Sequence, residues 1–204
     1  MSRPDEPSRR AWTRAGVLRA ALGGSAVVAG GAASATWVGG GPPAAAPSES
    51  TDVRILNLFL LLEQVQENFY REAVRSGKLD EARQTFARTA GAQESEHVAL
   101  LTDRLGRRAR QRPKSDFGDT TSDPERFQNA AIKLEEATIA AYIAQGANLT
   151  RVELTAVVPM VSVEARQVAW VRDLAGVSPA PRAADPPRDS AEILKELREE
   201  GFIT

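Results

Sequence analysis

The chain has 204 residues, of which 42% are hydrophobic and 26% are charged, and its formal net charge is −1. This balance is typical of a globular protein, and the absence of a net positive charge argues against a nucleic-acid-binding protein. With no cysteine and one histidine, disulfides, thiolate metal sites and three-histidine zinc sites are excluded, so any metal site must rest mainly on carboxylates.

Residues 1–35 have the order of an export signal. Arginines dominate the first part, an apolar run rich in Ala, Gly and Val follows from Ala20 to Val38, and Ala33-Ser34-Ala35 offers a cleavage site. The pair Arg9-Arg10, with Trp12 two residues on, resembles the twin-arginine signal. We therefore expect a twin-arginine translocon as partner and a location in the periplasm, the cell envelope or outside the cell. If the signal stays uncleaved, the same run would anchor the protein in a membrane.

Residues 36–51 are predicted to be a linker rich in Pro, Ala and Gly, and the remainder is predicted to be all-α. Apolar residues recur at helical spacing in four long segments, which form a four-helix bundle over residues 52–176. A Pro-rich tail with one short helix occupies residues 177–204. The predicted helices are 52–76, 79–105, 124–147, 151–175 and 191–199. The connection between the second and third helices is the longest, which favours a crossover there.

Local signals mark the ends of these helices. Gly77 and Gly106 are predicted stops, and Asp123-Pro124-Glu125 is a predicted helix start. Thr150 and Glu153 have the spacing of a capping box, and Ser190 is the predicted cap of the short helix. Pro159 predicts a kink in the fourth helix unless the boundary is misplaced.

The sequence contains an internal repeat. Each copy has a Leu-Glu pair with a Tyr seven residues after the Glu, and a second acidic motif about thirty residues on. The first copy consists of Leu62-Glu63, Tyr70 and Glu94-Ser-Glu-His97, and the second of Leu134-Glu135, Tyr142 and Glu164-Ala-Arg-Gln167. Two such helical hairpins, related by an approximate twofold axis, place the four glutamates on facing helices.

Each of the four glutamates lies in an apolar stripe of its helix. Around Glu63, for example, residues on the same face include Leu56, Phe59 and Leu60. Buried lone carboxylates are costly unless they are protonated, paired or bound to cations. Because none of the stripes contains Lys or Arg, two divalent ions, with charge +4, would balance the four glutamates. The alternative is a hydrogen-bonded polar cluster whose carboxyl pKa values are raised.

These motifs resemble the ferritin-like family, and more narrowly the bacterial exported ferritin-like domain proteins related to desiccation proteins. The resemblance covers about residues 52–203 and rests on Ile55–Glu63, Phe69-Tyr70, Glu94–Leu101, Leu134–Tyr142 and Val163–Trp170. It implies a di-metal site of iron or manganese in a ferritin-like antiparallel bundle. The metal-ligand positions that it implies are Glu63, Glu94, His97, Glu135, Glu164 and Gln167, with Tyr70 and Tyr142 as hydrogen-bonding neighbours.

Gln167 departs from the family pattern, since a second Glu-x-x-His would place histidine there. Its neutral amide oxygen is a weaker ligand than imidazole for transition metals. Two hypotheses about function follow. The first is an exported di-metal protein acting in iron handling or in oxygen or peroxide redox chemistry, with oxidase- or ferroxidase-like activity. The second is a non-catalytic structural or stress protein of the cell envelope that keeps the bundle without metal. Nothing in the pattern predicts a ferritin cage.

Overall fold

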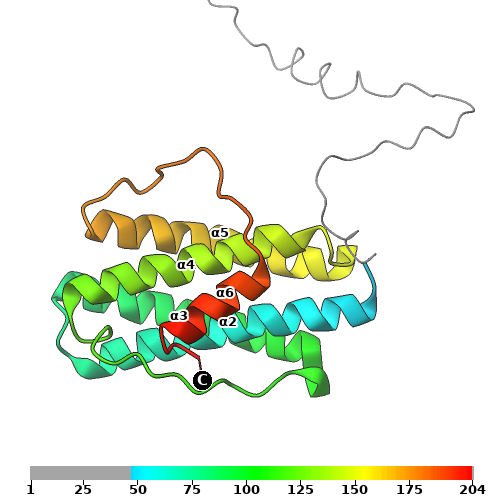
Figure 1. Cartoon of the computed structure of the whole chain (residues 1–204), viewed down its shortest axis with the longest axis horizontal. Coiled ribbons are helices and arrows are strands. Elements are labelled where there is room, and N and C mark those ends of the chain that lie inside the picture. Colours follow the sequence, from blue (N-terminus) through cyan, green and yellow to red (C-terminus); the bar gives the residue numbers. More distant parts are fainter. Residues whose placement is uncertain (1–46, 204) are drawn as a thin grey trace, which may run out of the picture. The chain divides into compact units, whose positions relative to one another are not determined.

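The computed structural model of the chain describes residues 47–203. The predicted export signal, with Arg9 and Arg10, and most of the predicted linker lie outside these residues. The described residues form α-helices and one short 3₁₀ helix and contain no strand, which confirms the all-α prediction. The helices are α2 Glu49–Ser76, α3 Glu81–Leu105, η1 Gly106–Arg108, α4 Pro124–Gly146, α5 Arg151–Leu174 and α6 Ser190–Glu199 (Figure 1).

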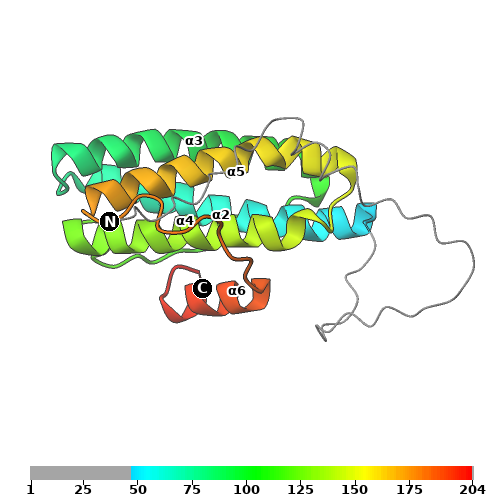
Figure 2. The same ribbon diagram turned by 90° about the horizontal axis from the view of Figure 1, so that it is seen from above.

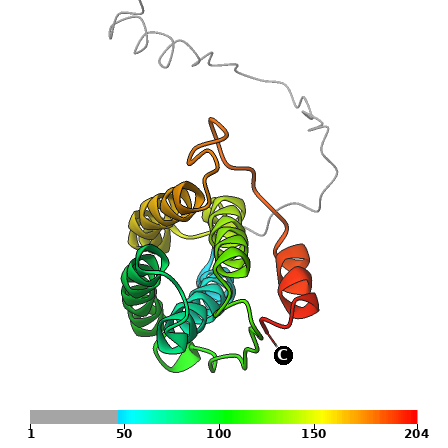
Figure 3. The same ribbon diagram turned by 90° about the vertical axis from the view of Figure 1, so that its left-hand side faces the viewer.

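The four long helices form a bundle that is seen end-on in Figure 3. Helix α2 packs against α3 and α4, and α5 packs against the same two helices. Helices α2 and α5 therefore lie on one diagonal of the bundle, and α3 and α4 lie on the other. The long connection from α3 to α4 crosses the bundle, as the sequence predicted. Both glutamate-bearing hairpins consequently point into one shared interior.

The long connection is tied along α2 by hydrogen bonds at both ends. The Asn57 side chain donates to the carbonyl of Arg108 at 3.0 Å and accepts from the backbone N–H of Arg110 at 2.8 Å. Near the other end of α2, the Ser76 hydroxyl donates to the carbonyl of Thr121 at 3.1 Å. These bonds hold a polar segment without regular structure against the bundle.

Helix α6 lies outside the bundle beside α4 (Figure 2). Its apolar face buries Ile193 and Leu197 completely or almost completely. After α6, Phe202 packs its ring against Phe117 of the long connection, with 5.4 Å between the ring centroids. The tail therefore covers the apolar face that α4 and the connection would otherwise expose.

The predicted helix starts are correct in some places and wrong in others. Asp123 caps α4, since its carboxylate accepts the backbone N–H groups of Glu125 and Arg126 at 3.1 and 2.9 Å. Helix α2 begins at Glu49 rather than at residue 52, because Ser48 provides an earlier cap. Helix α3 begins at Glu81 rather than at residue 79, because Asp80 is its cap.

Two predicted caps do not form. The Thr150 side chain makes no capping bond to its own helix. Instead, its hydroxyl and backbone N–H donate to the carboxylate of Asp52 at 2.6 and 2.8 Å. The cap of α6 is Asp189, not Ser190, because the Asp189 carboxylate accepts the backbone N–H of Ala191 at 2.8 Å.

Pro159 lies inside α5, so the predicted boundary of the fourth helix is not misplaced there. Helix α4 ends at Gly146 and α5 at Leu174, each one residue before the predicted end.

Within residues 47–203, none of the helices combines the length and the apolar character that a membrane crossing requires.

Candidate metal centre

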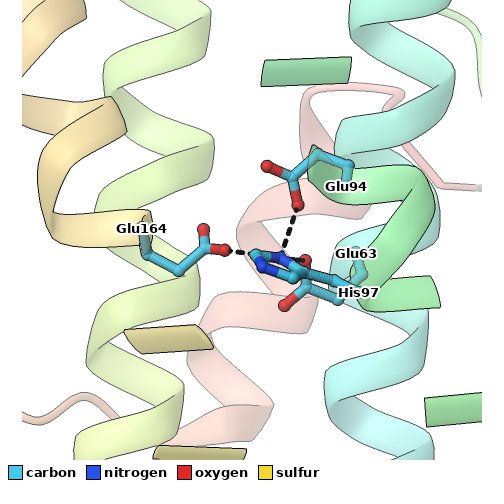
Figure 4. A group of neighbouring side chains, drawn as sticks. All are labelled: Glu63, Glu94, His97 and Glu164. Carbon is cyan, nitrogen blue, oxygen red and sulfur yellow. Dashed lines mark hydrogen bonds and ion pairs between the residues drawn. The ribbon is translucent and has the colours of Figure 1, made fainter. Parts of the chain in front are cut away.

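Three carboxylates and the only histidine of the chain meet inside the bundle. Glu63 comes from α2, Glu94 and His97 come from α3, and Glu164 comes from α5 (Figure 4). One candidate ligand atom from each residue lies within 4.8 Å of the other three. The three glutamates are fully buried, whereas His97 is 7% exposed. The histidine is therefore the one member of this group with any exposed surface.

One imidazole nitrogen faces all three carboxylates. Nδ1 of His97 lies 3.2 Å from Oε2 of Glu63, 3.3 Å from Oε2 of Glu94 and 2.9 Å from Oε1 of Glu164. A ring nitrogen carries at most one proton, so it can satisfy only one of these oxygens well. Both oxygens of Glu94 and Oε1 of Glu164 are buried and have no hydrogen-bond partner. Such groups are costly unless a cation or a proton compensates them.

Burial and mutual repulsion raise the pKa of three of the acids. Burial and the charge of Glu164 raise the pKa of Glu94 and Glu135 well above its ordinary value. Burial and the charge of Glu63 also raise the pKa of Glu164. Burial acts in the same direction on Glu63, but the neighbouring side chains of Glu94 and His97 lower its pKa instead. Burial lowers the pKa of His97, yet the three carboxylates around it, those of Glu164, Glu63 and Glu94, raise this pKa to about 12. Without a cation, the centre therefore retains protons.

The donor set fits a divalent transition-metal ion. Adjacent ligands around an ion with metal–ligand distances of about 2.0–2.2 Å lie about 3 Å apart. The distances of 2.9–3.3 Å from Nδ1 of His97 to the three carboxylates match that separation. Carboxylates with one imidazole suit iron and manganese. An ion there would also compensate the oxygens of Glu94 and Glu164 that have no partner.

The structure places Glu135 beside this group with partners of its own. Its Oε1 accepts a hydrogen bond from the hydroxyl of Tyr70, and its Oε2 accepts one from the side-chain amide of Gln66 at 2.9 Å. Tyr142 has the equivalent role at the glutamate of the first copy, since its hydroxyl donates to Oε1 of Glu63 at 2.6 Å. Both predicted tyrosine neighbours thus contact a glutamate, and each contacts the glutamate of the other copy.

Gln167 is buried, but its amide is turned to a neighbouring helix. Nε2 of Gln167 donates to Oε1 of Gln93 at 2.9 Å, while Oε1 of Gln167 has no partner. Four of the six residues expected as ligands therefore form one compact group. The other two, Glu135 and Gln167, each bind a glutamine side chain.

The sequence motifs did not indicate a role for Gln66, Thr138 and Gln93. Gln66 and Thr138 are fully or almost fully buried, and the Thr138 hydroxyl donates to Oε1 of Gln66 at 2.7 Å. The signal that reveals the first two is the repeat itself, because each lies three residues after the glutamate of its Leu-Glu pair. A polar residue at this offset shares the inward face of that glutamate.

Comparison with protein families gives a match over most of the bundle. A family model described as a ferritin-like domain matches residues 51–177, which is more than half of the chain. The matched segment contains the whole candidate metal centre. The comparison with curated proteins found no match.

Proposed function

Since this chain belongs to the ferritin-like domain family, we propose that it is a metalloprotein that binds iron or manganese at Glu63, Glu94, His97 and Glu164. One observation carries the proposal. Three fully buried carboxylates surround a single imidazole nitrogen, and in this group both oxygens of Glu94 have no hydrogen-bond partner. A divalent cation supplies the positive charge and the ligand bonds that these groups need.

The surrounding residues would orient the ligands. The Tyr142 hydroxyl holds Oε1 of Glu63 at 2.6 Å, which leaves Oε2 of that carboxylate facing His97. Hydrogen bonds of this kind fix ligand orientation and tune the metal. Because the glutamates are fully buried and the histidine is slightly exposed, ions and small molecules would reach the centre from the histidine side.

The biological role that we propose is iron handling or redox chemistry with oxygen or peroxide. Bound iron would supply electrons for the reduction of these small oxidants. The chain's own residues contribute a dry, acidic interior that excludes bulk water and limits access to small molecules.

The proposal also includes export, which rests on Arg9 and Arg10 in the sequence. Since the twin-arginine route carries folded proteins, metal would be loaded before translocation.

A metal-free structural or stress protein of the envelope is the second candidate. It is favoured by the hydrogen bonds at Glu135, whose two oxygens both have donors without any ion. Gln167, turned to Gln93 at the position where histidine was expected, points in the same direction. In a metal-free protein, the raised pKa values of Glu94 and Glu164 would favour their protonated forms.

Calorimetric titration of metal-free protein with Mn(II), and with Fe(II) under anaerobic conditions, separates the two candidates. We expect binding that weakens at least about 100-fold in His97→Ala and in Glu94→Gln, since each removes one ligand. Glu96→Gln is the matched control, because Glu96 lies on the same helix but is exposed. Circular dichroism establishes that each variant is folded. Absence of binding to the wild-type protein, or unchanged binding in both ligand variants, would exclude this centre.

A further inference from the structure

The centre is asymmetric at the level of its hydrogen bonds, although the sequence repeat is nearly symmetric. We propose that it holds one metal ion per chain, because the amide of Gln66 bridges the two carboxylates, Glu135 and Glu164, that a second ion would need. This inference rests on the proposed function, since it specifies the metal content of the same centre.

Gln66 lies in the bundle interior between two helices. Its Nε2 is 2.9 Å from Oε2 of Glu135 on α4 and 3.4 Å from Oε2 of Glu164 on α5. The residue is fully buried. A side-chain amide has two N–H donors, so it can donate to both carboxylates at once. The neutral amide thus makes the contacts to these two acids that a bridging cation would otherwise make.

Thr138 fixes the direction of this amide. The Thr138 hydroxyl donates to Oε1 of Gln66 at 2.7 Å, so the carbonyl end of the amide is held and the N–H end faces the acids. Residues 66 and 138 occupy the same position in the two copies of the repeat. The first copy has the amide of Gln66 at this position, and the second copy has the shorter Thr138, which donates a hydrogen bond to that amide. The twofold symmetry of the repeat is therefore broken at this position.

The distribution of unsatisfied oxygens follows the same asymmetry. Among the four core glutamates, the buried oxygens without a partner are both of Glu94 and Oε1 of Glu164. Of these, Oε2 of Glu94 and Oε1 of Glu164 face Nδ1 of His97. Neither oxygen of Glu135 lacks a partner, because Tyr70 and Gln66 donate to them. The side of the centre near Glu94 and His97 thus needs a cation to complete its bonding. On the other side, side chains already satisfy both oxygens of Glu135.

The residues at the histidine position of the two copies show the asymmetry as well. Nδ1 of His97 faces the three carboxylates of the proposed metal-binding group. Its repeat counterpart Gln167 instead donates its amide to Gln93. The side of the centre near Glu135 therefore has the amide of Gln66 between the carboxylates of Glu135 and Glu164, and it lacks an imidazole. Both features favour a single ion, bound on the His97 side.

The test is the metal content of the full chain after equilibration with excess Mn(II) and removal of unbound metal. We expect one Mn per wild-type chain, with the electron paramagnetic resonance spectrum of isolated ions. In the double variant Gln66→Thr/Gln167→His we expect two Mn per chain and the spectrum of a magnetically coupled pair. Gln66→Thr introduces the residue that the other copy already carries. Gln167→His alone is the control and should remain at one, since Gln66 still bridges the acids.

The outcomes distinguish this inference from the proposed function. Two Mn in the wild-type chain would overturn the single-ion inference, and a folded double variant that still binds one would overturn the role of Gln66 in excluding the second ion. Either result leaves the metalloprotein standing. No bound Mn in the wild-type chain would overturn both. Because the wild-type measurement alone decides between one and two ions, the inference does not depend on the folding of the double variant.

Discussion

Glu94 is the residue with the strongest unmet demand for a cation. It is fully buried, neither of its oxygens has a hydrogen-bond partner, and burial together with Glu164 and Glu63 raises its pKa well above the ordinary value. In metal-free protein this raised pKa favours the protonated carboxyl. A divalent ion would displace that proton, so metal binding and proton release at the centre are coupled.

This coupling predicts how pH affects the stability of the metal-free protein. Glu94, Glu135 and Glu164 have raised pKa values in the folded state, so the folded chain binds more protons than the unfolded chain above the ordinary value of 4.5. Stability then falls as pH rises. The raised pKa of His97 acts in the same direction, because its contribution is complete below 6.5 and is lost toward about 12. Glu63, with its lowered pKa, opposes the trend.

We therefore expect the unfolding free energy of metal-free protein to decrease between pH about 5 and about 9. With saturating Mn(II) the trend should reverse, because protons compete with the ion for the same ligands. Urea denaturation at several pH values, with and without metal, measures both trends. A metal-free stability that rises with pH would contradict the assigned protonation states.

The two tyrosines offer a matched comparison. Tyr142 donates to Glu63, a member of the proposed metal-binding group, whereas Tyr70 donates to Glu135, which lies outside it. We expect Tyr142→Phe to weaken Mn(II) binding by about 10- to 100-fold and Tyr70→Phe to change it less. Calorimetric titration of both variants provides the comparison. Equal effects would show that Glu135 is as important for the bound ion as Glu63.

At the scale of the helices, a partly buried contact joins the start of α2 to the start of α5. Asp52 accepts hydrogen bonds from the backbone N–H and the hydroxyl of Thr150 at 2.8 and 2.6 Å. This contact links the two helices that carry Glu63 and Glu164. It also explains why Thr150 does not form the predicted capping box.

We expect Asp52→Ala to lower the free energy of unfolding by about 2 kcal/mol, because it leaves a charge-assisted pair of hydrogen bonds unmade. Glu49→Ala, one turn earlier on α2, is the control. Glu49 pairs with Arg108 at 2.6 Å, but its side chain is 82% exposed, so we expect a loss of about 0.5 kcal/mol or less. Denaturant titration of both variants measures the difference. Equal losses would mean that the Asp52 contact contributes no more than a surface pair.

At the scale of the whole molecule, the fold was predictable because the repeat and the apolar stripes extend over whole helices. The burial of Glu63, Glu94, Glu135 and Glu164 followed from the same stripes. The parts that could not be predicted depend on partners distant in sequence. Thr150 binds Asp52 from 98 residues away, and Gln66 contacts Glu135 and Glu164 only when α2, α4 and α5 are assembled.

The whole chain also includes the N-terminal segment, for which the account predicts export. Lysine keeps the charge but loses the guanidinium fork, so Arg9→Lys/Arg10→Lys should leave the protein in the cytoplasm in fractionated cells. Arg3→Lys is the matched control, because it lies outside the paired motif. Normal export of the double variant would remove the twin-arginine assignment without affecting the metal centre.

The most direct test of the central claim is anomalous X-ray diffraction from crystals of the chain loaded with Mn(II), measured at the manganese absorption edge. We predict an anomalous peak among Nδ1 of His97 and the carboxylates of Glu63, Glu94 and Glu164, and no such peak in crystals of His97→Ala. A peak only elsewhere on the molecule, or none in this cluster at saturating Mn(II), would contradict it.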